Sequence, residues 1–291
     1  MAEDTECKRI ILKRGNINMK KISNITEELK KKILEFLYCD EIYNAILIEL
    51  IENHTENLGE LYIDETGEVI TEILHIKNDG NSDYTNFSYT SKEGLESIRC
   101  KINELNYKKI LLAGKLEDVK SLLKTLGHKK SIIPNIFYKL DMEKYQNISM
   151  KFQSKIRLAN LDSADLEIVK QFTARFLQAE TEEVEAITNT EKILAKMRSG
   201  VYLLEYENDA IGMARFIGKT KNFAEITSVY IDEAYRMKGL GKELIAHMIE
   251  IAIEEQKTPV LATSVSNIAA MKTYESMAFE RQGEYAFEFL H

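Results

Sequence analysis

The sequence predicts an α/β (α+β) protein of two domains, each a mixed, mostly antiparallel sheet flanked by helices. The chain has 291 residues, more than one domain usually contains, so two domains are expected. Short alternating apolar runs separated by turns containing Gly, Asn or Asp indicate antiparallel hairpins. Segments with apolar residues at helical spacing lie between these runs and predict the flanking helices.

The first domain is expected over residues 1–145. Thr26 is a suitable N-cap for a helix that we expect over residues 26–56. Residues 64–67 and 79–82 are turn signals between strand-like runs. The other expected elements are strands at 60–63, 69–76 and 85–89, a helix at 92–105, a strand at 109–113, a helix at 117–126 and a strand at 136–140.

The second domain is expected over residues 153–291, because the polar, weakly patterned residues 141–153 indicate a junction. Asp162 and Ser163 form a capping signal before an amphipathic segment that ends at Phe176. The expected elements are strands at 155–158, 201–206, 210–217, 223–231, 260–265 and 287–290, and helices at 164–176, 188–198, 244–253 and from residue 267.

The most informative segment is Arg236 to Gly241, which comes after an apolar run and precedes a helical pattern. A helix that begins after such a loop exposes unpaired backbone N–H groups at its positive end, a geometry that binds pyrophosphate. Gly239 and Gly241 would let phosphates approach the backbone closely. The spacing matches neither the dinucleotide fingerprint nor the P-loop. The alternative is an ordinary tight turn that caps the helix.

A second motif lies about 25 residues downstream, where an apolar strand leads into a helix carrying Asn267, Ala270, Tyr274 and Phe279. Loop and helix together resemble the GCN5-related N-acetyltransferase (GNAT) superfamily, and the resemblance covers residues 153–291. Ala278 stands where the family usually has glycine. A helix end often needs a left-handed residue, which a Cβ disfavours by roughly 1 kcal/mol.

The resemblance implies that acetyl-CoA is the cosubstrate and that one stretch of backbone holds it. The strand before the loop would pair with the pantetheine arm, and the loop N–H groups would hold the pyrophosphate. The implied cofactor-binding residues are Val229, Tyr230, Ile231, Arg236, Met237, Lys238, Gly239, Leu240, Gly241, Lys242, Asn267 and Ala270.

The resemblance also suggests two catalytic residues. Tyr274 matches the tyrosine that protonates the departing thiolate in many GNAT enzymes, and the alternative is a ring that only packs under the cofactor. Glu225 matches a glutamate general base of the histone-acetyltransferase members, and the alternative is an exposed or acceptor-orienting strand residue. The acids within residues 178–191 form either a solvated face or a surface that steers a cationic amine.

The first half has roughly the same order of elements but lacks the glycine loop around residues 111–116. We therefore interpret it as a degenerate GNAT-like domain without catalytic activity. The alternative is an unrelated α/β accessory domain.

Composition excludes several classes of protein. The net charge of −8 argues against nucleic acid as a partner, and no apolar run approaches the ~20 residues needed to span a membrane. The acidic N-terminus lacks a signal-peptide pattern, and three scattered cysteines, which we expect to be thiols, suit the cytoplasm. Five histidines without paired spacing indicate no metal site.

These observations predict a cytoplasmic N-acetyltransferase that moves an acetyl group from acetyl-CoA directly to a primary amine. The alternative is a non-catalytic acetyl-CoA-binding sensor or regulatory module. Neither the amine, small or peptidyl, nor the length of the acyl group nor the oligomeric state can be deduced from the sequence.

Overall fold

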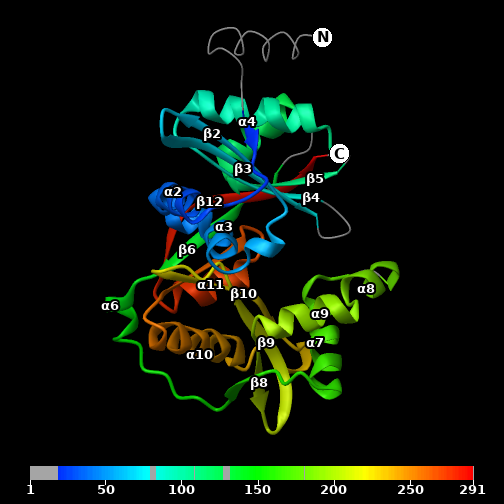
Figure 1. Ribbon diagram of the computed structural model, residues 1–291. Helices are drawn as coiled ribbons and strands as arrows, with labels where there is room; N and C mark the ends of the chain where they lie inside the picture. The colour runs from blue at the N-terminus through cyan, green and yellow to red at the C-terminus, as the bar shows by residue number, and fades with distance from the viewer. Residues whose placement is uncertain (1–18, 79–82, 108, 127–131, 180, 291) are drawn as a thin grey trace. The chain divides into compact units, whose positions relative to one another are not determined.

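The computed structural model describes residues 19–78, 83–107, 109–126, 132–179 and 181–290 (Figure 1). The turn expected at residues 79–82 lies outside these residues. The chain forms two compact units. Unit 1 comprises Met1–Ile136 and Gly283–His291, and unit 2 comprises Phe137–Gln282.

Unit 1 is a mixed sheet with helices on both faces. Its sheet has the strand order β1-β2-β3-β4-β5-β12, in which only the β4–β5 pair is parallel. Ile73 and Leu74, neighbours on β3, belong to separate hydrophobic clusters, because successive side chains point to opposite faces of a sheet. The elements are β1 (Lys20–Lys21), α2 (Glu27–Leu37), α3 (Glu41–Asn53), β2 (Glu60–Thr66), β3 (Val69–Asn78), β4 (Asp83–Tyr89), α4 (Lys92–Leu105), β5 (Ile110–Lys115), α5 (Leu116–Thr125) and the end of β12 (Phe279–Leu290).

Unit 2 has the same kind of architecture, with the strand order β6-β11-β10-β9-β8-β7. The β10–β11 pair is parallel, whereas β7–β8, β8–β9 and β9–β10 are antiparallel. Helices α7 and α9 lie on one side of strands β8 to β10, and α10 lies on the other (Figure 1). The elements are β6 (Asn135–Leu140), α6 (Met142–Tyr145), β7 (Lys155–Leu158), α7 (Ser163–Phe176), α8 (Thr181–Ile187), α9 (Thr190–Arg198), β8 (Val201–Tyr206), β9 (Asp209–Ile217), β10 (Phe223–Ile231), α10 (Leu240–Glu254), β11 (Thr258–Ser264) and α11 (Ile268–Glu275).

The predicted fold class is confirmed, and most expected strands and helices form within a few residues of their expected bounds. The helix expected over 26–56 is divided by a 3₁₀ turn at Tyr38–Asp40. A short helix, α8, lies where no regular element was expected. Asp162 caps α7 as expected, its side chain accepting a hydrogen bond from the Asp165 amide at 2.9 Å.

The end of the chain differs from the expected arrangement. Residues 287–290 are strand as predicted, but Tyr285–Leu290 pairs antiparallel with β5 of unit 1. The unit boundaries therefore differ from the expected domains 1–145 and 153–291. Unit 2 begins at Phe137, before the polar segment, and the last residues of the chain belong to unit 1. The alternation of apolar and polar residues predicts which side chains lie on each face of a strand, but it does not predict which strand pairs with it.

One expectation about the cysteines is wrong. Cys39 is an exposed free thiol, but Cys100 is disulfide-bonded. The cysteines therefore do not support a reducing compartment, and the cytoplasmic location stays a prediction.

Candidate cofactor and acceptor site

The candidate site begins where two parallel strands separate. Strands β10 and β11 pair from Phe223 with Thr258 to Ile226 with Leu261. Beyond that point the pairing of β10 with β9 shifts register between Thr227 and Tyr230. Ser228 within this bulge has a φ of 54°, which is unusual for a residue other than glycine. The bulge turns the end of β10 away from its regular course.

The predicted strand residues Val229, Tyr230 and Ile231 lie on this displaced end of β10. The Tyr230 ring is buried against Phe172, with ring centroids 5.2 Å apart. Its side chain therefore belongs to the core of unit 2. A contact between this segment and a ligand would use the backbone, as expected for a peptide-like pantetheine arm.

The next loop runs from Asp232 to Gly239 and is held against the end of β10. The Arg236 Nε donates to the Ile231 carbonyl at 3.0 Å, and its guanidinium lies 5.7 Å from the Tyr230 ring centroid. Met237 has a φ of 62° and a fully exposed side chain. Lys238 places its ammonium 5.0 Å from the centroid of the Tyr235 ring. These contacts give Arg236 a structural role in shaping the loop.

Helix α10 starts at Leu240, with Gly239 as its N-cap. Gly239 has a φ of 82°, and no side chain of the described residues caps the helix there. The Lys242 amide already donates to the Gly239 carbonyl at 2.9 Å. The Lys242 amide is therefore not free to bind phosphate, and the predicted phosphate donors that remain are the amides of residues 237–241.

Gly241 lies in the first turn of α10, where its conformation is helical. A Cβ at this position would meet Ile231 Cγ1 at 3.8 Å, an ordinary contact. The protein itself therefore has room for a side chain here, although glycine costs about 1 kcal/mol relative to alanine in a helix. The packing of the protein therefore does not require glycine at this position.

A buried carboxylate fixes the same turn of α10 to the start of the second half. Glu243 is 4% exposed and accepts hydrogen bonds from the amides of Gln153 and Ser154, both at 2.9 Å. The Ser154 hydroxyl donates to the same oxygen. These bonds hold the beginning of α10 rigidly, and they occupy the carboxylate.

The downstream motif forms the start of α11. Asn267 is the N-cap of this helix, and its side-chain oxygen accepts from the Ala270 amide at 3.1 Å. That bond gives both predicted residues a structural role, and it leaves the Asn267 amide nitrogen as the group suited to contact a cofactor. Ala278, just after the helix, has a φ of 63°. The expected left-handed residue is therefore present, and it is an alanine.

Tyr274, the predicted general acid, lies in the last turn of α11 and is 7% exposed. Its ring packs edge-on against Tyr138 and Phe279, with centroids 6.1 and 6.0 Å apart. Burial, and to a lesser degree the nearby Tyr138, raises the pKa of the phenol to about 12. Tyr274 is therefore protonated at neutral pH, which is the form a proton donor needs.

Glu225, the predicted general base, lies on the regular part of β10 just before the strands separate. It is paired with Ile217 on β9 and with Val260 on β11, and its side chain is partly exposed. The strand positions it one residue before the last parallel pair, close to the point where β10 and β11 diverge.

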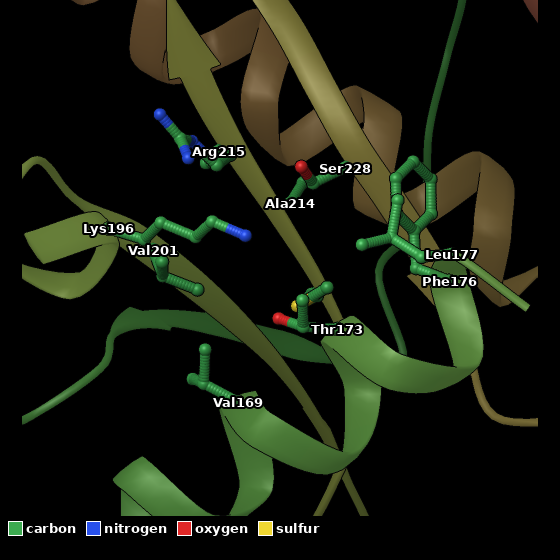
Figure 2. Close-up of a pocket in the computed structure, with 10 residues that line it drawn as sticks. Val169, Thr173, Phe176, Leu177, Lys196, Val201, Ala214, Arg215 and Ser228 are labelled. Carbon is green, nitrogen blue, oxygen red and sulfur yellow. The ribbon is translucent and has the colours of Figure 1, made fainter. Parts of the chain in front are cut away.

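A pocket of about 60 Å³ lies beside the bulge, between α7, α9 and strands β8 to β10. Figure 2 shows the Lys196 ammonium pointing into the middle of this pocket, with the Thr173 and Ser228 hydroxyls on its other sides. The lining residues are Val169, Thr173, Phe176, Leu177, Lys196, Val201, Met213, Ala214, Arg215 and Ser228.

Sequence reasoning missed the polar members of this pocket. Lys196 comes one helical turn after the buried Ile193, a spacing that places it toward the same side of α9. Ser228 could not be predicted as a pocket residue, because no sequence pattern marks a serine that adopts a left-handed conformation within a strand. Of the acids expected to steer a cation, Glu185 and Glu191 are exposed and do not line the pocket. Glu180 lies outside the described residues.

Neither a metal-binding group nor a membrane-spanning helix is found among the described residues. No group of three or more His, Cys, Asp or Glu side chains is arranged to hold a metal ion in the part of the chain that the structure describes. No helix within the described ranges is long and apolar enough to cross a membrane.

Comparison with known proteins finds similarity to one family within the second half. Residues 165–279 match the model of the acetyltransferase (GNAT) family. A curated relative, spermine/spermidine N(1)-acetyltransferase of Bacillus subtilis (strain 168), is 31% identical over 94 residues. That alignment covers 29% of this chain and 61% of the relative, less than two thirds of its length.

Similar solved structures extend the likeness of fold to both halves. A tandem GNAT protein from the clavulanic acid biosynthesis pathway has a TM-score of 0.65 at 9% identity, covering 94% of this chain and 98% of that one. A GNAT-family acetyltransferase from Colwellia psychrerythraea has a TM-score of 0.57 at 13% identity, covering 94% and 100%. Residues 165–279 thus match the acetyltransferase (GNAT) family, and the chain has a fold similar to that of a tandem GNAT protein.

Proposed function

We propose that unit 2 transfers an acetyl group from acetyl-CoA to a primary amine, directly and within a ternary complex. The observation that carries this proposal is the start of α10. There, Gly239 adopts a left-handed conformation, and Gly241 leaves space that the fold does not need. Both glycines come after a strand whose end is displaced from its parallel neighbour, and together they form a cradle suited to a pyrophosphate and its pantetheine arm.

Backbone amides of residues 237–241 would hold the pyrophosphate, and the end of β10 would pair with the pantetheine arm. Arg236 contributes by fixing the loop to Ile231 rather than by a required phosphate contact. Lys238 and Lys242 add positive charge beside the helix start. Asn267 would contact the cofactor through its amide nitrogen.

The bound acetyl thioester supplies the acyl group: the amine nitrogen bonds to the carbonyl carbon, the carbon–sulfur bond breaks, and the sulfur leaves as a thiolate. Glu225 accepts the proton that the nitrogen loses, directly or through water. Tyr274 donates a proton to the thiolate and is reprotonated from solvent. A phenol with a pKa of about 12 donates to a thiolate, with an ordinary pKa of about 8.5, only at hydrogen-bonding distance.

The burial of Tyr274 also favours a second candidate, an acetyl-CoA-binding sensor in which this ring only packs. Thiol release from acetyl-CoA with a panel of amines separates the two functions. Spermidine belongs in the panel because the curated relative is named for it. Amine-dependent release supports the transferase. Saturable acetyl-CoA binding in calorimetry, without release with any amine, supports the sensor.

A further inference from the structure

The pocket beside the bulge is adjacent to the segment that would carry the acyl group. Ser228 belongs to both, since it lines the pocket and forms part of the bulge that displaces β10. Arg215 lies on β9 opposite Thr227 of β10, the last residue before the register shift. A molecule bound in this pocket therefore lies next to the predicted reaction centre.

The pocket combines a positive charge with apolar walls. Lys196 and Arg215 are its ionisable residues, and its walls include Val169, Val201 and Met213. The pKa of the Lys196 ammonium is lowered, first by burial and then by repulsion from Arg215 and Lys192. Each of these causes disfavours a second cation in the pocket.

No carboxylate of the described residues lies within ion-pair distance of the Lys196 ammonium. The pocket of unit 1 differs, because its Lys115 forms an ion pair with Asp40. A buried charge without a counter-ion is costly, and a ligand that supplies the opposite charge recovers that cost. Lys196 is thus suited to meet an anion that arrives with the substrate.

We propose that the amine acceptor carries a compact anionic group, a carboxylate or a phosphate, that binds Lys196 in this pocket. The proposal rests on acetyl transfer as the function of unit 2. The pocket's apolar walls would hold the carbon skeleton, and the amine would face the end of β10. Polyamines, which lack an anion, would be poor acceptors.

Matched pairs of acceptors test the proposal with the full chain. Each acid is compared with the amine that lacks only the anion: leucine with isoamylamine, lysine with cadaverine, and phosphoethanolamine with ethanolamine. Thiol release is measured for each, with spermidine included. We expect kcat/KM to be at least tenfold higher for the acid member of the leucine or lysine pair, or for phosphoethanolamine, and the preferred pair identifies carboxylate or phosphate.

Variants of Lys196 test whether this residue causes the preference for anionic acceptors. Lys196→Gln should abolish it, mainly through a higher KM for the acid with kcat little changed, because the lysine binds without taking part in the chemistry. Lys196→Glu should reverse it in favour of the plain amines. Lys192→Gln, on the same helix but outside the pocket lining, is the matched control and should keep the wild-type preference.

Two results would overturn the inference while leaving acetyl transfer intact: plain amines or spermidine preferred by the wild type, or an unchanged preference in Lys196→Gln. If no amine supports thiol release, acetyl transfer fails instead. Calorimetry of leucine, lysine and phosphoethanolamine with the acetyl-CoA-loaded chain then decides the inference. Binding that weakens at least tenfold in Lys196→Gln upholds it, and absent or unaltered binding rejects it.

Discussion

Each unit contains a parallel strand pair, β4–β5 in unit 1 and β10–β11 in unit 2, and the units differ in the connection from the first strand of that pair to the next helix. In unit 2, the loop from β10 to α10 extends from Asp232 to Gly239 and ends in a left-handed glycine. In unit 1, only Thr90 and Ser91 connect β4 to α4. A short connection leaves no run of free loop amides, whereas the longer loop presents several beside a helix N-terminus.

Groups of the protein itself also occupy the N-terminal end of α4, where a phosphate would otherwise bind. The Ser91 hydroxyl accepts from the Gly94 amide at 3.3 Å. A Cβ on Gly94 would lie 2.3 Å from Glu72 Oε1, so the buried Glu72 carboxylate rests directly against this turn. A negative charge at the positive end of a helix stabilises unit 1 and repels a phosphate. In the first turn of α10, by contrast, a Cβ on Gly241 would meet only Ile231 Cγ1 at 3.8 Å, and the Glu243 carboxylate is bonded to the amides of Gln153 and Ser154.

The pockets of the two units differ in the same way. Unit 1 has a pocket of about 130 Å³ beside the ends of β4 and β5. Within it Tyr89 donates to Asp118 at 2.6 Å, and Lys115 pairs with Asp40. In unit 2, the pocket presents Lys196 to its interior. Unit 1 thus pairs these polar groups with each other, whereas no carboxylate of the described residues pairs with Lys196 in unit 2, a difference that agrees with the interpretation of the first half as non-catalytic.

The largest expected effect is on kcat, and it compares the loss of one tyrosine hydroxyl in each unit. Tyr274→Phe removes the proposed proton donor but keeps its packing, so kcat should fall by roughly 10²–10⁴ while acetyl-CoA affinity stays nearly constant. Tyr89→Phe in unit 1 is the matched control and should leave kcat unchanged. Steady-state kinetics and calorimetry measure both. Near-wild-type turnover in Tyr274→Phe, with chemistry rate-limiting, would remove this residue from the mechanism.

The next effect concerns the open helix start. Gly241→Asp places a carboxylate in the first turn of α10, which should not destabilise the fold because acids are favoured there. Acetyl-CoA affinity should nevertheless fall tenfold or more, since the carboxylate repels the pyrophosphate. Gly241→Ala, whose Cβ fits the fold but enters the space proposed for the pyrophosphate, separates size from charge and should weaken acetyl-CoA binding less than Gly241→Asp does. Unchanged affinity in a folded Gly241→Asp variant would refute the cofactor loop.

A smaller effect tests the comparison of the two units directly. Titration calorimetry should give one acetyl-CoA site per chain, because Glu72 and the short turn close the start of α4. Gly241→Asp should weaken that single site without revealing a second. Two sites of similar affinity in the wild type would contradict the interpretation of unit 1 as degenerate.

The smallest effect concerns helix ends. In unit 1, α4 ends at Asn106 with a φ of 50°, a residue type that tolerates this conformation, whereas in unit 2 the residue after α11 with such a conformation is Ala278, at 63°. Ala278→Gly should therefore stabilise unit 2 by about 0.5–1 kcal/mol, the relief of strain exceeding the added entropy of the unfolded chain. Urea unfolding measures the change. A loss of stability would show that the left-handed alanine is not strained.

Local patterns in the sequence were enough to predict most strands and helices, the glycine loop and the start of α11. Gly239, Asn267 and Ala278 adopt the loop, cap and left-handed conformations that their neighbours in sequence indicate. Such features depend on bonds within a few residues, so the sequence determines them directly.

Only the tertiary structure decided which strands are neighbours and which side chains share a pocket. Tyr285–Leu290 joins β5 instead of unit 2, Ser228 takes a left-handed conformation inside a strand, and Lys196 faces an apolar pocket. Each results from packing between segments far apart in the chain. Hydrophobic periodicity specifies which face of a strand or helix is buried, but the partner of that face is chosen by the fold as a whole.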